Sequence, residues 1–284
     1  MKTHLKLIFA LLTAAMLFPA GVQARKKGPV QIKVMSYNIR FGSAKDGDNA
    51  WENRKPGTPR MLEDQAPDIF GVQEALDYQI GYILENCPQY KSYGIGREDG
   101  VSKGEHMSIF WNKKRIKLLK CGTFWLSETP EEPSIGWDAA CRRTATWTLM
   151  KDRQSGKKFY YVNTHLDHRG WEARKNGLAL IVERIAAMNP KGYPMILTGD
   201  FNMRPQRPEF ENLKKVMKDA RVTARTTDTG YTFSGWKINP SSESVIDYVW
   251  YSGFSDCPEY HVVRKEYGVP FVSDHFPIVA TLVF

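Results

Sequence analysis

The sequence has few cysteines, four in 284 residues, and none of them forms a C-x-x-C pair. Structural zinc sites usually draw their ligands from such closely spaced pairs, so the cysteine spacing argues against a structural zinc. Four cysteines can pair in three ways, which leaves the disulfide state open. Because a chain of this length does not need disulfides to fold, we expect buried free thiols. The residues concerned are Cys87, Cys121, Cys141 and Cys257.

The sequence also lacks low-complexity linkers, fixed-period repeats and, beyond Arg25-Lys26-Lys27, any dense run of basic residues. The absence of repeats argues against an adhesive or solenoid array. The absence of a long basic run mildly disfavours a dedicated nucleic-acid binder. The remaining composition, 42% hydrophobic and 25% charged, is that of an ordinary globular protein.

A long apolar run occurs at the amino end, where residues 7–18 follow Lys2 and Lys6 and precede Val22-Gln23-Ala24. A basic start, a short apolar centre and a small residue at the end are typical of a secretory signal peptide. The run is too short to cross a bilayer comfortably. We therefore predict a signal peptide at residues 1–24, cleavage after Ala24, and an exported (periplasmic or secreted) mature protein with no transmembrane segment.

The predicted mature chain, residues 25–284, has a length compatible with a single domain. Residues 1–24 contain two of the 40 Lys and Arg and none of the 31 Asp and Glu, so the mature chain has 38 basic and 31 acidic residues, a net charge of +7. This excess favours anionic partners such as phosphate esters, nucleic acid or a membrane surface.

Apolar runs typical of strands alternate with segments whose apolar residues recur at helical spacing, which predicts an α/β fold. The predicted strands are residues 32–39, 69–72, 107–111, 118–126, 145–150, 159–164, 195–197, 245–250 and 276–283. The predicted helices are residues 60–65, 76–84, 178–185 and 209–218.

The segment Gly199-Asp200-Phe201-Asn202 directly follows the apolar run at 195–197. Side chains two residues apart at the end of a strand point to the same side, so Asp200 and Asn202 can together hold a water and a substrate oxygen. A simple capped turn is the alternative explanation, because Asp and Asn favour turns.

Polar residues of the same kind stand at five other predicted strand ends. Each taken alone is explained by a helix cap, a turn or a satisfied core residue. Together they suggest a divalent cation, because buried carboxylates are costly unless they are paired or bind a metal. An oxygen-rich set with few histidines suits Mg²⁺, with Mn²⁺ as a possible substitute. These residues are Asn38, Glu74, His165, Asp247, Asp274 and His275.

The order of these motifs resembles that of the endonuclease/exonuclease/phosphatase superfamily, the DNase-I-like fold. The motifs are Ser-Tyr-Asn-Ile at 36–39, Val-Gln-Glu at 72–74, Asn-Thr-His-Leu at 163–166, Gly-Asp-Phe-Asn at 199–202, Ile-Asp-Tyr at 246–248 and Ser-Asp-His at 273–275. The resemblance implies a four-layer α/β/β/α sandwich of two packed mixed β-sheets flanked by helices. Segments 51–54, 122–130 and 136–140 look like those of a bacterial exported branch.

The resemblance also implies roles in phosphoester hydrolysis. Glu74 would be the main Mg²⁺ ligand, helped by Asn38 and Asp274. Asp200 would orient or deprotonate the attacking water, and Asn202 would hold that water or a phosphate oxygen.

The resemblance implies that His275, oriented by Asp247, binds the scissile phosphate or acts as an acid–base. It places His165 on the other side of the phosphate. Arg143 fits a position that contacts phosphate. Which of these residues acts as the general acid, and whether one or two metal ions bind, stay open.

Five residues outside the family motifs are candidates for a substrate rim of aromatic and cationic side chains: Trp51, Trp137, His168, Arg169 and Trp171. A solvated charged face is the alternative for the charged members.

We expect an exported Mg²⁺-dependent phosphoesterase that cleaves a phosphodiester or phosphomonoester, with a small-molecule or lipid-headgroup substrate slightly preferred. A nuclease acting on DNA or RNA is the first alternative. A non-catalytic binding protein on the same scaffold is the second, and the oligomeric state is left open.

Overall fold

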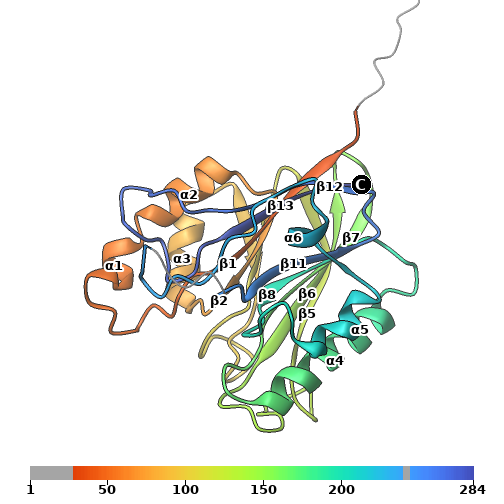
Figure 1. The fold of residues 1–284 in the computed structure, drawn as a ribbon, viewed down its shortest axis with the longest axis horizontal. Coiled ribbons are helices and arrows are strands. Elements are labelled where there is room, and N and C mark those ends of the chain that lie inside the picture. The colour runs from red at the N-terminus through yellow and green to blue at the C-terminus, as the bar shows by residue number, and fades with distance from the viewer. Residues whose placement is uncertain (1–27, 239–243) are drawn as a thin grey trace, which may run out of the picture.

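The computed structural model describes residues 28–238 and 244–284 (Figure 1). The predicted signal peptide lies outside the described residues, so its cleavage stays a prediction, as does the assignment of residues 25–284 to a single domain. Within the described ranges, no helix combines the length and the apolar character needed to cross a bilayer.

The structure contains two mixed sheets, of seven and six strands. The seven-stranded sheet has the order β10 (Thr226–Thr227), β12 (Asp256–Val262), β13 (Ile278–Val283), β1 (Gln31–Asn38), β2 (Ile69–Gln73), β4 (Ile109–Asn112) and β3 (Tyr90–Tyr93). The six-stranded sheet has the order β5 (Ile116–Trp125), β6 (Thr144–Asp152), β7 (Lys158–His165), β8 (Met195–Asp200), β11 (Asp247–Ser252) and β9 (Lys218–Asp219).

Helices cover the outer faces of both sheets. Figure 1 shows α1 (Trp51–Arg54), α2 (Gly57–Gln65) and α3 (Asp77–Asn86) at the left, beside β1 and β2. The longer α4 (Trp171–Met188) and the short α5 (Glu211–Lys214) lie at the lower right. The remaining helical elements are α6 (Ala220–Thr223) and the two 3₁₀ turns η1 (Gly47–Asn49) and η2 (Pro208–Phe210).

Three apolar clusters separate these layers. The first joins the facing sides of the two sheets, with Val34 and Ile278 from one sheet packed with Phe159 and Ile196 from the other. The second lies under α4 and α5, and the third lies under α1, α2 and α3. This arrangement confirms the predicted four-layer α/β/β/α sandwich.

Two local predictions differ from the structure. The predicted helix at 209–218 ends at Lys214, because the chain turns there and enters β9. Strands β3 and β12 have no counterpart among the predicted strands. All four cysteines carry free thiols; Cys87 and Cys257 are buried, whereas Cys121 and Cys141 are half-buried.

A polar contact joins the two sheets directly behind the strand ends that carry the motifs. The buried amide of Asn163 on β7 donates to the carbonyl of Val72 (2.7 Å) and accepts from the side chain of Gln73 (2.7 Å) across the sheet interface. Thr198 Oγ1 donates to the same Asn163 oxygen (3.0 Å). A Cβ atom at Gly71 would lie 2.4 Å from this oxygen, so the close approach requires glycine.

Replacing Asn163 by Leu keeps the approximate volume but leaves Val72 and Gln73 without their partner in a dry interface. We expect a loss of about 2–4 kcal/mol in the free energy of unfolding, measured by urea denaturation. The control Asn86→Leu, on the exposed end of α3, should change it by less than about 0.5 kcal/mol. A loss no larger than that of the control would contradict the role of the sheet-joining amide.

Candidate active site

Residues of both sheets meet where parallel strands end together. Asn38 is the last residue of β1, and Glu74 directly follows β2, which pairs with β1 in parallel. His165 and Asp200 end β7 and β8, and the two residues are directly paired in the sheet. The carboxyl ends of neighbouring parallel strands lie at one edge of a sheet, so these side chains converge.

Antiparallel strands bring the last two motifs to the same edge. Asp247 begins β11 and is directly paired with Asp200, so His165, Asp200 and Asp247 stand side by side on three adjacent strands. The segment containing Asp274 and His275 precedes β13, which runs antiparallel to β1. The structure therefore brings all the predicted catalytic and metal-binding residues together.

The same turn follows β1 and β8. Asn38 Oδ1 accepts from the backbone N–H of Arg40 (2.9 Å), and Asp200 Oδ1 accepts from that of Asn202 (2.9 Å). Arg40 and Asn202 both have a left-handed backbone, with φ of 62° and 49°, and Glu74 after β2 has φ of 62°. Such strained backbone is common at functional sites, where the surrounding fold holds it in place.

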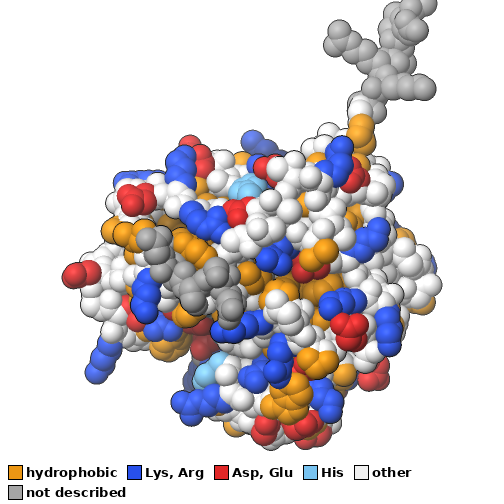
Figure 2. Space-filling view, viewed as in Figure 1, with side chains coloured by type: hydrophobic (Ala, Val, Ile, Leu, Met, Phe, Trp, Pro, Cys, Tyr) orange, Lys and Arg blue, Asp and Glu red, His pale blue; other side chains and the backbone are white. Residues whose placement is uncertain are grey.

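A pocket of about 500 Å³ opens at this edge. Figure 2 shows the hollow at the lower left of the molecule, where acidic, basic and histidine side chains meet. The lining residues are Arg40, Phe41, Glu74, Arg97, Glu105, Cys141, Arg143, His165, His168, Asp200, Asn202, Phe233, Ile246, Asp274 and His275. Asn38 and Asp247 lie behind this lining and support it.

Glu74 is held by two donors. Its carboxylate accepts from the side-chain amide of Asn38 (3.0 Å) and from the backbone N–H of Phe41 (2.8 Å). Burial raises the pKa of Glu74, but His275, Asn38 and Phe41 outweigh it and lower the pKa below its usual value. The amide nitrogen of Asn38 also donates to Asp200 (3.1 Å), so Asn38 fixes two carboxylates at once. Its role as a metal ligand stays a prediction.

His275 and Asp247 form a buried ion pair. The imidazole Nδ1 donates to Asp247 Oδ2 (2.9 Å), which also accepts from Thr232 Oγ1 (2.6 Å). Burial lowers the pKa of His275, but Asp247, Asp200 and Asp274 outweigh it and raise the pKa to about 10. The imidazole is therefore a cation at neutral pH, with Nε2 directed toward Asp200 at 3.7 Å.

The pKa of Asp200, unlike that of Glu74, is raised. Burial raises its pKa, His275 lowers it, and Asp247 and Glu74 raise it again, to about 7. Burial likewise raises the pKa of Asp274. Burial is the main cause of both shifts, and the neighbouring carboxylates of Glu74 and Asp247 add to it.

The donor set fits a divalent cation. The buried or half-buried carboxylates of Glu74, Asp200, Asp247 and Asp274 lie near two cations, Arg40 and protonated His275, and Arg40 is already paired with Asp46. The carboxylates therefore outnumber the cations, and a divalent ion would offset part of this excess. Ligand atoms of Glu74, His165 and Asp200 lie within 4.8 Å of one another, which can hold an ion. Glu74, Asp200 and Asp274 supply the oxygen ligands that Mg²⁺ prefers.

His165 lies beside Asp200 as a neutral base. Asn202 Nδ2 donates to its Nε2 (3.0 Å), and burial together with Arg143 and Arg97 places the pKa of His165 well below its usual value. Its Nδ1 has no hydrogen-bond partner among the described residues. Arg143 lines the pocket, and its Nε donates to Asp167 (3.3 Å); its contact with phosphate stays a prediction.

The rim prediction needs correction. Of its five residues, His168 lines the pocket, whereas Trp137, Arg169 and Trp171 do not. Trp171 lies instead in a second groove, with the guanidinium of Arg207 over its ring at 4.2 Å.

Trp51 was wrongly placed at the rim, because its ring is only 3% exposed and packs in the core under α1 to α3. The buried guanidinium of Arg54 lies 5.0 Å from this ring. Arg54 donates to the carbonyls of Ile39 (2.7 Å) and Val272 (2.8 Å). The segment 51–54 therefore supports the end of β1 and the segment that leads to Asp274.

Sequence reasoning missed several pocket residues. Arg97 and Glu105 come from the segment between β3 and β4, which contains no family motif. Phe41 and Phe233 were also missed, and Phe233 packs edge-on against His275 with ring centroids 4.8 Å apart. One sequence feature could have pointed to Arg97, namely His106. The backbone of this buried histidine forms isolated β-bridges with Ala75 and Gly96, which brings the segment of Arg97 next to that of Glu74.

Comparison with known proteins agrees with this geometry. The model of the Endonuclease/Exonuclease/phosphatase family matches residues 35–275. An uncharacterised protein, L388, of Acanthamoeba polyphaga mimivirus is 30% identical over 250 residues, which cover 81% of this chain and 91% of the relative.

Two solved structures from Bacteroides thetaiotaomicron are each 34% identical, with a TM-score of 0.86. One is an endonuclease/exonuclease/phosphatase family protein, matched over 90% of this chain and 98% of its own. The other is a mannosyl-6-phosphatase, matched over 89% of this chain and 100% of its own.

The chain belongs to the endonuclease/exonuclease/phosphatase family. Members of this family are divalent-metal-dependent hydrolases that act on phosphoester bonds, including those of nucleic acids.

The ion pair of His275 and Asp247 predicts a pH effect. Protonated His275 persists to about pH 10 because of its acidic neighbours. Asp247→Asn removes one of them, so the pKa of His275 should fall and the alkaline loss of activity should begin at lower pH. We also expect kcat/KM at pH 7 to fall about 10²- to 10⁴-fold, since the imidazole loses its orienting carboxylate.

The measurement is kcat/KM for p-nitrophenyl phosphate between pH 5 and 10, with the histidine titration followed by NMR. Asp219→Asn is the control, a buried carboxyl on β9 that does not line the pocket. An unchanged pKa of His275 in Asp247→Asn would refute the electrostatic argument.

Proposed function

We propose that this protein is an exported, divalent-metal-dependent phosphoesterase that attacks a small-molecule phosphate ester with an activated water. The observation that carries the proposal is the convergence of carboxylates from both sheets with a cationic His275 at one small pocket. Mg²⁺ is the proposed cofactor, with Mn²⁺ as a substitute, because the available ligands are mainly oxygen atoms.

In this proposal, Glu74 and Asp274 hold the ion with help from Asp200. When bound, the ion polarises the phosphate oxygens and lowers the pKa of a water. Asp200 accepts a proton from the attacking water, which Asn202 orients through its position after β8. His275 donates from Nε2 to a phosphate oxygen, and Arg143 donates to another. His165 lies next to Asp200 and donates from Nδ1 to a phosphate oxygen.

The size of the pocket supports a small substrate rather than a polymer. Its volume of about 500 Å³ falls within the range of small-molecule sites. On the face drawn in Figure 2, basic side chains are spread out rather than gathered into one stripe that would follow a nucleic-acid backbone. A lipid headgroup stays within the proposed class, because its phosphate ester has the same chemistry.

Sugar phosphates are the first substrates to test. The mannosyl-6-phosphatase from Bacteroides thetaiotaomicron shares 34% of its residues with this chain over nearly the whole of both chains. Its name places its substrate among phosphorylated sugars, and we extend that class to this protein as a proposal.

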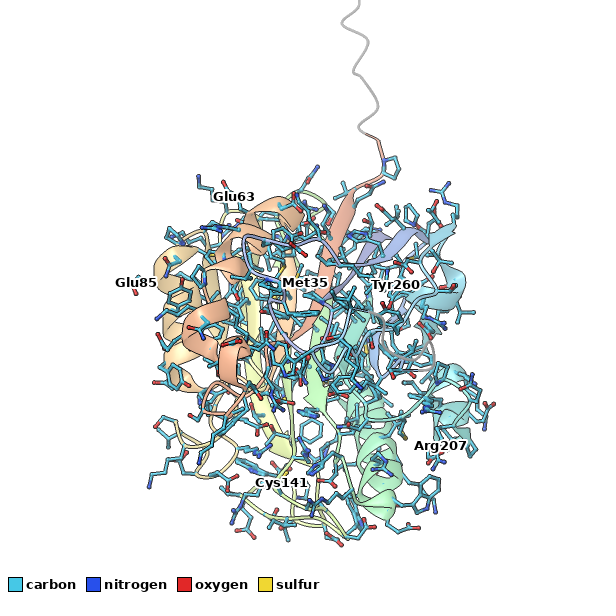
Figure 3. All side chains as sticks on the ribbon, turned by 60° about the vertical axis from the view of Figure 1, so that its left-hand side comes forward. Met35, Glu63, Glu85, Cys141, Arg207 and Tyr260 are labelled. Carbon is cyan, nitrogen blue, oxygen red and sulfur yellow. The ribbon has the colours of Figure 1, made fainter. Side chains whose placement is uncertain are left out.

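The assay compares p-nitrophenyl phosphate, bis(p-nitrophenyl) phosphate, hexose 6-phosphates and plasmid DNA, each with Mg²⁺ or with EDTA. We expect hydrolysis of the small esters and its loss in EDTA. Glu74→Gln should lower kcat/KM by about 10²-fold or more, because it removes the main anionic ligand. Glu63→Gln is the control, on an exposed residue at the opposite end of the molecule from Cys141 (Figure 3).

Preferential cleavage of plasmid DNA would favour the nuclease instead. Activity that is unchanged in EDTA would contradict the metal-dependent mechanism. If Glu74→Gln alters stability alone and no ester is cleaved, the binding-protein alternative replaces the enzyme.

Export is part of the proposal and rests on the amino-terminal sequence. Expression of the full chain in a bacterial host should yield a periplasmic or secreted protein whose first residue is Arg25. Intact-mass spectrometry and amino-terminal sequencing measure this directly. A cytoplasmic protein that still begins at Met1 would contradict it.

A further inference from the structure

One side of the pocket is built from residues that the family motifs do not include. Arg97 and Glu105 come from the segment between β3 and β4, Arg143 precedes β6, and His168 follows β7. We call these four residues the ion-pair wall. Their neighbour Cys141, labelled in Figure 3, lies among the loops beyond the strand ends.

The ion-pair wall is close to electrically neutral. Arg97 donates to Glu105 (2.6 Å) and to Glu98 (3.3 Å), and Arg143 donates to the fully buried Asp167 (3.3 Å). The catalytic half of the pocket, by contrast, has an excess of negative charge. The wall therefore offers neither a second cationic phosphate site nor a second excess of carboxylates.

A metal on the wall is also excluded by its hydrogen bonds. Cys141, Asp167 and His168 have possible ligand atoms within 4.8 Å of one another. Arg143, however, donates to both Asp167 Oδ2 and His168 Nδ1, the latter at 2.9 Å. A guanidinium in that place repels a cation and occupies the two ligand atoms.

The same bond fixes the proton on His168. A guanidinium can only donate, so His168 Nδ1 accepts and the ring proton is on Nε2. His168 is an exposed residue whose partial desolvation and neighbour Arg143 lower its pKa while Asp167 raises it; the acceptor role of Nδ1 itself requires a neutral ring. Nε2–H is thus a neutral donor at the pocket.

The wall has a free acceptor and free donors that line the same pocket. Among the described residues, no hydrogen bond engages Oε1 of Glu105, Nη2 of Arg97 or Nε2 of His168. A hydroxyl group both donates and accepts, so it satisfies such a mixed set, whereas an aromatic base needs a ring to stack on. The rings of the pocket, Phe41 and Phe233, belong to the catalytic half, where Phe233 packs on His275.

The wall is held rigidly relative to the catalytic half. The indole of Trp125 donates to the carbonyl of Arg97 (2.8 Å). His106 bridges Gly96, beside Arg97, to Ala75, beside Glu74. Arg142 donates to Glu98 (2.7 Å) from the other side. These contacts arise from segments 94–106 and 122–143, so the wall is preorganised to bind a ligand at a fixed distance from Glu74.

We propose that the ion-pair wall binds the leaving group of the substrate, and that this group is a polyhydroxylated small molecule such as a sugar. The inference rests on the proposed phosphoesterase function and names the part of the substrate that the pocket recognises. Glu105 accepts from one hydroxyl, and Arg97 and His168 donate to the same or a neighbouring hydroxyl.

The test compares leaving groups with and without hydroxyls. The ratio of kcat/KM for mannose 6-phosphate or glucose 6-phosphate to that for phenyl phosphate is measured in the wild type, Glu105→Gln and His168→Ala. We expect the ratio to fall at least about 10-fold in each variant, because each variant loses one or two hydrogen bonds to the substrate. His261→Ala on β12 is the matched control and should keep the ratio, since His261 does not line the pocket.

A second measurement needs no turnover. Protein labelled with ¹³C in histidine and treated with EDTA is titrated with mannose 6-phosphate and with inorganic phosphate, and the ring resonance of His168 is followed by NMR. We expect the sugar phosphate to shift this resonance and inorganic phosphate to leave it nearly unchanged.

The outcomes separate the two proposals. If small phosphate esters are hydrolysed but both variants keep the ratio and the His168 resonance does not respond, the wall proposal is wrong and the phosphoesterase stands. If no ester is hydrolysed while the resonance responds to the sugar phosphate, the wall proposal stands and the enzymatic function fails. Equal loss with all substrates would mean that the wall supports the fold alone.

Discussion

The side-chain amide of Asn163 joins the two sheets directly behind the site, and the spacing of the site residues depends on how the sheets meet there. It bonds Val72 and Gln73 of the opposite sheet immediately before Glu74, and it lies two residues before His165 on its own strand. Ligand atoms from the two sheets can approach within 4.8 Å because this joint sets the spacing directly behind them. An apolar residue of similar size would pack there, but it would not specify the register between the sheets.

The same turn closes β1 and β8, one strand from each sheet, with an Asx side chain that accepts the N–H two residues on. One turn presents Asn38 and Arg40, and the other presents Asp200 and Asn202. The resulting site gathers several carboxylates, and burial together with Asp247 and Glu74 raises the pKa of Asp200 to about 7. An excess of buried charge is a cost to the fold that a binding function explains.

The sequence allowed much of this site to be predicted, because Asp200, Glu74 and His275 stand in short motifs at predicted strand ends whose order resembles that of the family. The layered fold was predicted through the family resemblance carried by those motifs. Arg97 and Glu105 could not be predicted, since an irregular segment has no period that says which side chains point inward. Trp51 was misplaced because the sequence does not distinguish a buried tryptophan from an exposed one. The guanidinium of Arg54 packs against its ring and is held by carbonyls of Ile39 and Val272, which are far apart in the chain.

The predicted metal ligands come from both sheets, which has a thermodynamic consequence. An ion bound as proposed, by Glu74 from one sheet and Asp200 from the other, would find its complete site only in the native state. Mass action would then add about 2.7 kcal/mol to the stability at a concentration 100 times the Kd. The melting temperature therefore reports ion selectivity without a substrate. At equal concentrations, the preferred divalent ion raises the melting temperature most.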